Sequence, residues 1–201
     1  MKDKKNISDL LKLNIDFMGF IFYPKSKRYI VPENLQAYIS GISSIKKVGV
    51  FVNESEKNII KLNQEYQLDY IQLHGSETPE LCTSLKNKGL KIIKAFQVNE
   101  AFNFNICDTY TNVCDYFLFD TKSIQYGGSG LQFDWELLKN YKNNKPYFLS
   151  GGISISDAEN IKKISDKRIA AIDINSKFEN EYGLKKIEVI DEFINNTRIN
   201  Y

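Results

Sequence analysis

The stretch KKVGVFVNESEKNIIKLNQEYQLDYIQLH, residues 46–74, contains one complete strand–helix–strand pattern. Two apolar runs, Lys46–Val52 and Tyr70–His74, flank the segment Glu54–Gln67, in which apolar residues recur at helical spacing. Runs that are nearly continuous in Val, Ile, Phe and Leu are typical of strands buried on both faces of a parallel sheet. We therefore expect a βαβ unit here, in which the helix carries the chain back so that the two strands run parallel.

The same alternation extends to both ends of the chain, in units of about 20 to 30 residues. The other strand candidates are Asp16–Tyr23, Lys91–Val98, Tyr116–Asp120, Pro146–Ser150 and Arg168–Asn175. The other helix candidates are Asp3–Leu13, Pro32–Ile42, Pro79–Asn87, Asn99–Tyr110, Asp134–Tyr141, Ser156–Ile164 and Lys185–Asn195. Because no linker interrupts this series, the sequence predicts a single α/β domain over residues 1–201, with helices covering a parallel sheet.

The numbers of predicted helices and strands limit the possible folds. Eight helix candidates stand against seven strand candidates, and the first and the last element are both helices. A TIM (β/α)8 barrel closes only with its first strand present, whereas an open sheet tolerates an odd number of strands. We expect a barrel that lacks strand 1, in a chain truncated at its N-terminus, and the count alone leaves the open sheet possible.

Composition excludes several classes of protein. The 201 residues carry 27 Lys and Arg against 25 Asp and Glu, a net charge of +2, which argues against a nucleic-acid partner. Cys82, Cys107, Cys114 and a single His have no metal-ligand spacing, so we expect no metal and no disulfide framework. The longest apolar runs, of about six to eight residues, are too short for a membrane span. With no signal peptide visible, we expect a cytoplasmic protein without a membrane partner.

The active site of such a barrel lies at the C-terminal ends of its strands. Arg28 follows the first strand candidate and could bind a carboxylate, or it could lie in a solvated basic loop. His74 ends another candidate, where a lone His is more often structural than catalytic. Asp120 precedes the glycine-rich segment Gly127–Gly130, which suits a general acid under a mobile loop or an Asp that braces a loop.

The last two strand candidates are followed by residues that suit an anion. Phosphate sites in these barrels commonly use the last two strand loops, and glycine lets backbone N–H groups approach the anion closely. We therefore expect Gly151, Gly152, Asn175 and Ser176 to form a phosphate site. Asp173 could face either the pocket or a buried polar partner.

Six segments resemble the phosphoribosylanthranilate isomerases of tryptophan biosynthesis, in the right order and over nearly the whole chain. They are GFIFYPKSKRYI (19–30), KKVGVFVN (46–53), IQLHGSETPELC (71–82), FLFDTK with YGGSGLQFDW (117–135), LSGGIS (149–154) and IDINS (172–176). The resemblance implies a cofactor-free Amadori rearrangement of N-(5-phosphoribosyl)anthranilate to 1-(2-carboxyphenylamino)-1-deoxyribulose 5-phosphate. It implies a small-molecule substrate, and we expect a monomer or a weak homodimer.

The resemblance also assigns roles to residues. Asp120 matches the family's general acid, and Arg28 matches the arginine that serves the anthranilate carboxylate. Asp173 matches an aspartate at the pocket edge, and His74 matches a histidine that lines the site. The positions that match the phosphate-binding loops are Gly151, Gly152, Asn175 and Ser176.

Two departures from the family pattern matter for function. The family's general base is a Cys in a K-[IV]-C-G-[MIL] motif at the end of strand 1, and none of the three cysteines in this chain matches it. The missing base and the missing strand are therefore one absence. Lys177 stands where many relatives have Gly, which either hinders close backbone approach to the phosphate or adds a charge.

The alternative function is a catalytically impaired barrel that binds a phosphate ligand, although Arg28 and Asp120 together favour an enzyme. A different sugar-phosphate isomerase on the same barrel would not explain the PKSKRY and QLHG motifs together.

Overall fold

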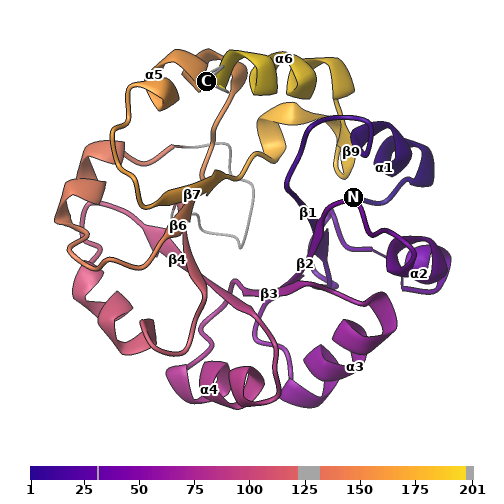
Figure 1. The fold of residues 1–201 in the computed structure, drawn as a ribbon, viewed down its shortest axis with the longest axis horizontal. Coiled ribbons are helices and arrows are strands. Elements are labelled where there is room, and N and C mark those ends of the chain that lie inside the picture. Colours follow the sequence, from indigo (N-terminus) through magenta and orange to yellow (C-terminus); the bar gives the residue numbers. More distant parts are fainter. Residues whose placement is uncertain (31, 122–131, 198–201) are drawn as a thin grey trace.

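The computed structural model describes residues 1–30, 32–121 and 132–197. Seven strands form one parallel sheet whose order in space is their order in the chain. They are β1 (Phe17–Ile21), β2 (Lys46–Phe51), β3 (Tyr70–Leu73), β4 (Ile92–Val98), β5 (Tyr116–Thr121), β6 (Tyr147–Leu149) and β7 (Ile169–Ile172). The sheet curls around a central axis, and the helices form an outer ring (Figure 1). This architecture confirms the prediction of a barrel of the TIM type with seven strands.

Six α-helices lie in the described part of the chain, and their ends follow the sequence signals. They are α1 (Lys4–Leu10), α2 (Pro32–Ser40), α3 (Glu56–Tyr66), α4 (Pro79–Asn87), α5 (Ala158–Lys162) and α6 (Ile187–Thr197). Ser55 caps α3 by accepting a hydrogen bond from the backbone N–H of Asn58, and Gln67 ends it in a left-handed conformation. Thr78 caps α4 in the same way.

The prediction of eight helices is wrong in detail. The candidates near Asn99–Tyr110 and Asp134–Tyr141 are the 3-10 segments η1 (Phe104–Tyr110) and η2 (Trp135–Asn140). A third, η3 (Ile155–Asp157), precedes the short α5. The Asn, Asp and Thr side chains of η1 compete for backbone groups and so disfavour a regular α-helix.

A short hairpin near the C-terminus was not predicted. It follows η4 (Ser176–Phe178) and consists of β8 (Glu179–Glu181) and β9 (Leu184–Lys185). The turn uses Gly183 at φ +85°, a conformation that favours glycine. Lys185 therefore belongs to a strand and not to the start of the last helix.

Two layers of apolar side chains pack against the sheet. Alternate residues of the strands point inward and form a small cluster inside the curl, consisting of Val48, Ile93, Ala95, Leu118 and Phe148. The residues between them, such as Phe117 and Phe119, point outward and pack under the helices. This alternation fixes which residues at the strand ends point into the barrel and which point away from it.

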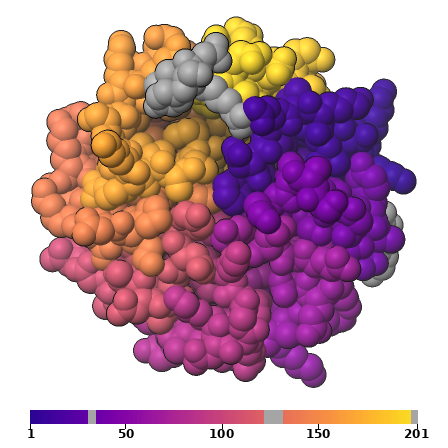
Figure 2. Space-filling model, in the orientation of Figure 1, coloured from indigo at the N-terminus to yellow at the C-terminus, as the bar shows by residue number. Residues whose placement is uncertain are grey.

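The sheet does not close within the described residues, because β1 and β7 are its two edge strands, and the outer side of β1 carries only an isolated parallel bridge between Ile21 and Tyr29. A cavity of about 460 Å³ extends along this seam between the two edge strands. It is lined at the seam by Phe17 and Gly19 of β1, by Ala171 of β7 and by Phe193 of α6. Behind it, α1 and α6 lie side by side, seen as indigo beside yellow in Figure 2.

The first helix is docked on the C-terminal hairpin at the rim of the seam. The Asn6 side-chain amide donates to the Lys185 carbonyl at 2.9 Å, and the Lys185 backbone N–H donates to Asn6 Oδ1 at 2.8 Å. This reciprocal pair satisfies a buried Asn and joins residues 179 positions apart.

Candidate active site

The cavity continues to the C-terminal ends of the strands, where a polar pocket lies. All eight candidate site residues line it, so the structure brings together every one of them. They are Arg28, His74, Asp120, Gly151, Gly152, Asp173, Asn175 and Ser176. The segment Gly127–Gly130, expected to form a mobile loop, lies outside the described residues.

Asp120 and His74 lie side by side in the pocket, with their side chains in contact. Asp120 is the last residue but one of β5, and its Oδ1 accepts a hydrogen bond from the backbone N–H of Thr121 at 2.8 Å. His74, which directly follows β3, places Nε2 3.2 Å from Oδ2 of Asp120. Both side chains are mostly buried, with 15% of Asp120 and 10% of His74 exposed. A carboxyl group in this position can deliver a proton to a ligand in the pocket.

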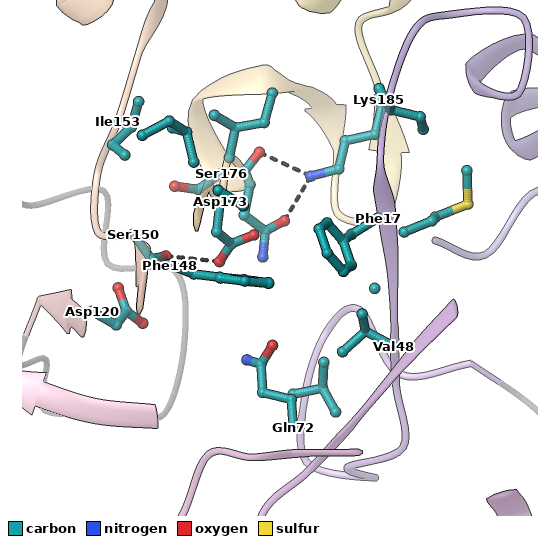
Figure 3. A pocket seen from close by; sticks show the side chains of 18 of the residues that line it. Phe17, Val48, Gln72, Asp120, Phe148, Ser150, Ile153, Asp173, Ser176 and Lys185 are labelled. Carbon is teal, nitrogen blue, oxygen red and sulfur yellow. Dashed lines mark hydrogen bonds between the residues drawn. The ribbon is translucent and has the colours of Figure 1, made fainter. Parts of the chain in front are cut away.

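The sequence left open whether Asp173 faces the pocket or a buried polar partner, and in the structure it does both. Ser150 Oγ donates to Asp173 Oδ2 at 2.8 Å, and Figure 3 shows this bond beside Asp120. Burial raises the pKa of Asp173, and the nearby charge of Asp120 adds to the shift. Two carboxyl groups in one pocket disfavour a doubly ionised state.

The opposite wall carries a buried cluster of charges. Glu179 Oε2 accepts from Nε of Arg28 at 2.8 Å and lies 2.6 Å from its Nη2, while Oε1 lies 3.2 Å from Nζ of Lys185. Burial alone would raise the pKa of Glu179, but the hydrogen bond from Arg28 and the two positive charges hold that pKa below its usual range. Since two cations face one carboxylate, the cluster carries a net positive charge that suits an anionic ligand.

Lys185 connects this cluster to the loop after β7. Its Nζ donates to the carbonyl of Asn175 at 3.0 Å and to Oδ1 of Asn175 at 2.6 Å, as drawn in Figure 3. Burial lowers the pKa of Lys185, and the charge of Glu179 opposes that shift. The Asn175–Ser176 turn is therefore held in place by a buried cation.

The loop after β6 needs glycine. Gly151 has φ +97° and Gly152 has φ +67°. A Cβ added at Gly151 would lie 2.3 Å from Oγ1 of Thr121, so no side chain fits there. The N–H groups of these two glycines donate hydrogen bonds to no other described residue. Such a loop can bind the oxygens of a phosphate group.

The three cysteines lie outside the pocket. Cys82 on α4, Cys107 in η1 and Cys114 before β5 are all fully buried among the outward-facing core residues. Burial raises the pKa of Cys107 to about 12, which removes it further from thiolate chemistry. None of them can act as a base on a ligand in the pocket.

The predicted site residues omit several polar side chains of the pocket and its charge cluster, among them Gln72, Ser150, Glu179 and Lys185. Gln72 belongs to the QLHG motif, and the alternation along β3 places it on the same side as His74. Glu179 and Lys185 lie in the hairpin that was not predicted. Only their ion pairs with distant residues identify them, and no local pattern shows those pairs.

A buried ion pair lies under His74. Lys94, on β4, is 3% exposed, and its Nζ lies 3.1 Å from Oε2 of Glu77, which is 1% exposed. Lys94 also donates to the carbonyl of Gly75 at 2.8 Å, and Glu77 accepts from the N–H groups of Gly75 and Asn53. This network fixes the backbone that follows His74.

Glu77→Gln should lower the free energy of unfolding by about 3–5 kcal/mol, because it leaves the Lys94 ammonium buried without its counter-charge. Urea denaturation measures the loss. The double variant Glu77→Gln with Lys94→Met should recover most of the stability, because no buried charge then remains. Equal stability of Glu77→Gln and the unsubstituted chain would show that the pair does not matter to the fold.

Two negative findings concern the described residues alone. None of the described helices has both the length and the apolar character that crossing a membrane requires. Within residues 1–30, 32–121 and 132–197, no three His, Cys, Asp or Glu side chains cluster in a way that could hold a metal ion.

Comparison with known proteins gives a consistent result. The model of the N-(5'phosphoribosyl)anthranilate (PRA) isomerase family matches residues 1–196. An N-(5'-phosphoribosyl)anthranilate isomerase of Parabacteroides distasonis is 45% identical over 96% of this chain and 89% of its own length. The crystal structure of the Thermotoga maritima phosphoribosyl anthranilate isomerase superposes with a TM-score of 0.85 at 34% identity, covering 98% of this chain and 95% of that one.

A further solved structure bears on the ligand. It is a phosphoribosyl anthranilate isomerase in complex with reduced 1-(o-carboxyphenylamino)-1-deoxyribulose 5-phosphate, with a TM-score of 0.83 and 30% identity over 98% of this chain and 94% of that one. The match over residues 1–196 includes all eight candidate site residues of the polar pocket. This chain belongs to the N-(5'-phosphoribosyl)anthranilate isomerase family.

Proposed function

We propose that this isomerase of tryptophan biosynthesis uses Asp120 as the general acid that opens the ribose ring of N-(5-phosphoribosyl)anthranilate. The observation that carries the proposal is the position of Asp120, which lines the same pocket as the glycine loop after β6 and the Arg28–Lys185 cluster. A substrate with a phosphate at one end and a carboxylate at the other would span these two regions.

The reaction itself requires two proton transfers. Asp120 gives its proton to the ring oxygen while the anthranilate nitrogen lone pair forms the C=N bond, so that the C–O bond breaks and an iminium results. A general base then removes the proton from C2, giving an enolamine, and proton transfer to carbon yields the ketone. Positioned acid and base groups each contribute typically about 10²–10⁴-fold to such steps.

The two anionic groups of the substrate would bind to different sets of residues, which adjoin where Lys185 contacts Asn175. The phosphate fits the loop of Gly151 and Gly152 together with Asn175 and Ser176. The carboxylate fits the side with the net positive charge, where Arg28 and Lys185 share Glu179. Lys177, on the exposed side of the phosphate loop, would add a charge there.

The open seam supports a further part of the proposal. Both edge strands are parallel and, apart from the isolated bridge of Ile21 to Tyr29, unpaired along the seam, and the cavity between them is lined there by apolar residues. An eighth parallel strand inserted there would complete the barrel and would end beside the pocket. By resemblance to the family, that strand would carry the Cys that acts as base. Without it, the chain would be a phosphate-ligand-binding barrel with impaired catalysis.

Partners and location follow from the same function. One solved structure is of monomers generated from the dimeric phosphoribosylanthranilate isomerase of Thermotoga maritima. For this chain we propose a monomer or a weak homodimer, with the small-molecule substrate as its ligand and no nucleic acid or membrane partner. The proposed location is the cytoplasm, where a phosphorylated intermediate of biosynthesis is retained.

A binding experiment tests the proposed position of the phosphate group. The ligand is the reduced product analogue, reduced 1-(o-carboxyphenylamino)-1-deoxyribulose 5-phosphate. Ser176→Asp places a negative charge against the phosphate and should weaken binding about a hundredfold, since like charges brought together cost several kcal/mol. Ser176→Asn, of similar size and neutral, should bind within a few fold of the unsubstituted chain. Calorimetric titration measures both. An unchanged affinity of Ser176→Asp would place the phosphate elsewhere.

A further inference from the structure

Gln72 lies in β3 and His74 directly follows that strand, two residues further on, so their side chains point to the same, inner side of the barrel. Nε2 of the Gln72 amide lies 2.9 Å from Nδ1 of His74. An amide nitrogen can only donate, so Nδ1 must be the acceptor in this bond and cannot carry a proton. A neutral His74 ring therefore holds its single proton on Nε2.

The second ring nitrogen points at Asp120. Nε2 of His74 lies 3.2 Å from Oδ2 of Asp120, but it is not aligned for a hydrogen bond, and it is buried with no hydrogen-bond partner among the described residues. The other oxygen of Asp120 is occupied by the N–H of Thr121. Buried polar groups normally have a partner. The Nε2–H group of His74 is therefore free to donate a hydrogen bond to negative charge that develops on Asp120 Oδ2 during the reaction.

We propose that Gln72 is a positioning residue for the isomerisation: it fixes His74 as an Nε2–H donor that stabilises the Asp120 carboxylate formed when the acid gives up its proton. The proposal rests on the proposed role of Asp120. As the proton moves from Oδ2 to the substrate ring oxygen, negative charge develops on Oδ2, and the Nε2–H group is already in place to bond to it.

The opposite tautomer would act against the reaction. A ring with its proton on Nδ1 would present a lone pair to Asp120 and would accept the acidic proton in competition with the substrate. The tautomer of a His is set by the partner of its other nitrogen, and the only partner of Nδ1 in the described structure is Gln72. The charged groups around the ring are Asp120 and, more distantly, Asp173 on the pocket side, with the Lys94–Glu77 pair beneath the loop after it.

The composition of the chain makes the tautomer directly measurable. His74 is its single histidine, so the ¹⁵N NMR spectrum of the chain labelled at histidine contains one imidazole. At a pH where the ring is neutral, we expect the proton on Nε2 and none on Nδ1. Gln72→Met, which keeps the volume but removes the donor, should give a mixture of tautomers. Gln72→Glu, which can only accept, should place a proton on Nδ1.

Steady-state kinetics distinguishes a positioning role of Gln72 in the reaction from a purely structural role. Gln72→Met should lower kcat about tenfold, the loss expected for one hydrogen bond, with KM changed far less. Gln72→Glu should lower kcat at least as much and alter its pH profile. Gln64→Met, the same substitution on the exposed face of α3, is the control and should change neither constant.

Each outcome of these experiments either supports or overturns the proposed role of Gln72. A proton on Nδ1 in the unsubstituted chain overturns the proposal, and so does an unchanged tautomer in Gln72→Met. A shifted tautomer with unchanged kcat would also overturn it, because the tautomer of His74 would then not serve the reaction. Full activity of Asp120→Asn would remove the acid role instead, and the tautomer measurement would still report on Gln72 independently.

Discussion

An N-terminal extension that supplies an eighth strand ending in Cys-Gly should raise the turnover of phosphoribosylanthranilate about 10²–10⁴-fold over that of the 201-residue chain, the usual contribution of a general base. About eight added residues suffice, since strands are commonly five to six residues long. The strand would pair with both free edges, those of β1 and β7, and the cysteine would point into the pocket. The fall in substrate fluorescence follows the reaction.

The matched control carries the same extension with Ser in place of the Cys. It fills the seam and pairs both edges but lacks the base, so it should gain stability in urea denaturation while its turnover stays low. The two variants thus separate the structural and the chemical part of the strand. Rapid turnover by the 201-residue chain itself would contradict the expectation and would place the base among the described residues.

Asp120→Asn should lower kcat about 10²–10⁴-fold, because an amide cannot deliver the proton that opens the ring. The substitution preserves the shape of the side chain and an oxygen for the hydrogen bond from the N–H of Thr121. Binding of the reduced product analogue should therefore change little, and the loss should appear in kcat.

Asp134→Asn serves as the control for this substitution. Asp134 is exposed, caps η2 and lies outside the pocket, and Asn caps equally well. Its kcat should equal that of the unsubstituted chain. If Asp120→Asn kept kcat within tenfold, the proton would come from another group, and Asp173, with its raised pKa, would be the next candidate.

The strands and the strand-end residues could be predicted because both follow from local pattern. A parallel strand buried on two faces gives a continuous apolar run, and the residue that ends such a run, as Asp120 does, must lie at the site edge of the barrel. Likewise, Gly151 and Gly152 mark a loop that needs positive φ. That Arg28 and Asp173 line the same pocket could not be predicted from local pattern alone. It followed only once a barrel, which brings the ends of its strands together, was assumed.

What was missed depends on contacts between distant parts of the chain. Glu179 binds Arg28 across 151 positions, and no window of sequence contains both. Lys185 was placed at the start of a helix because its neighbours have helical periodicity, whereas the turn at Gly183 puts it into a hairpin. The tautomer of His74 depends on its contact with the side-chain amide nitrogen of Gln72, which only the folded structure brings about.

The docking of α1 on the C-terminal hairpin has a consequence for biosynthesis on the ribosome. Asn6 leaves the exit tunnel early, but its partner, Lys185, is made 179 residues later. At about 5–20 residues per second, the first helix waits on the order of ten seconds or more for its binding site. During that time β1 also presents a free edge, so the nascent chain passes through a stage in which its N-terminal unit is open to chaperones and to other nascent chains.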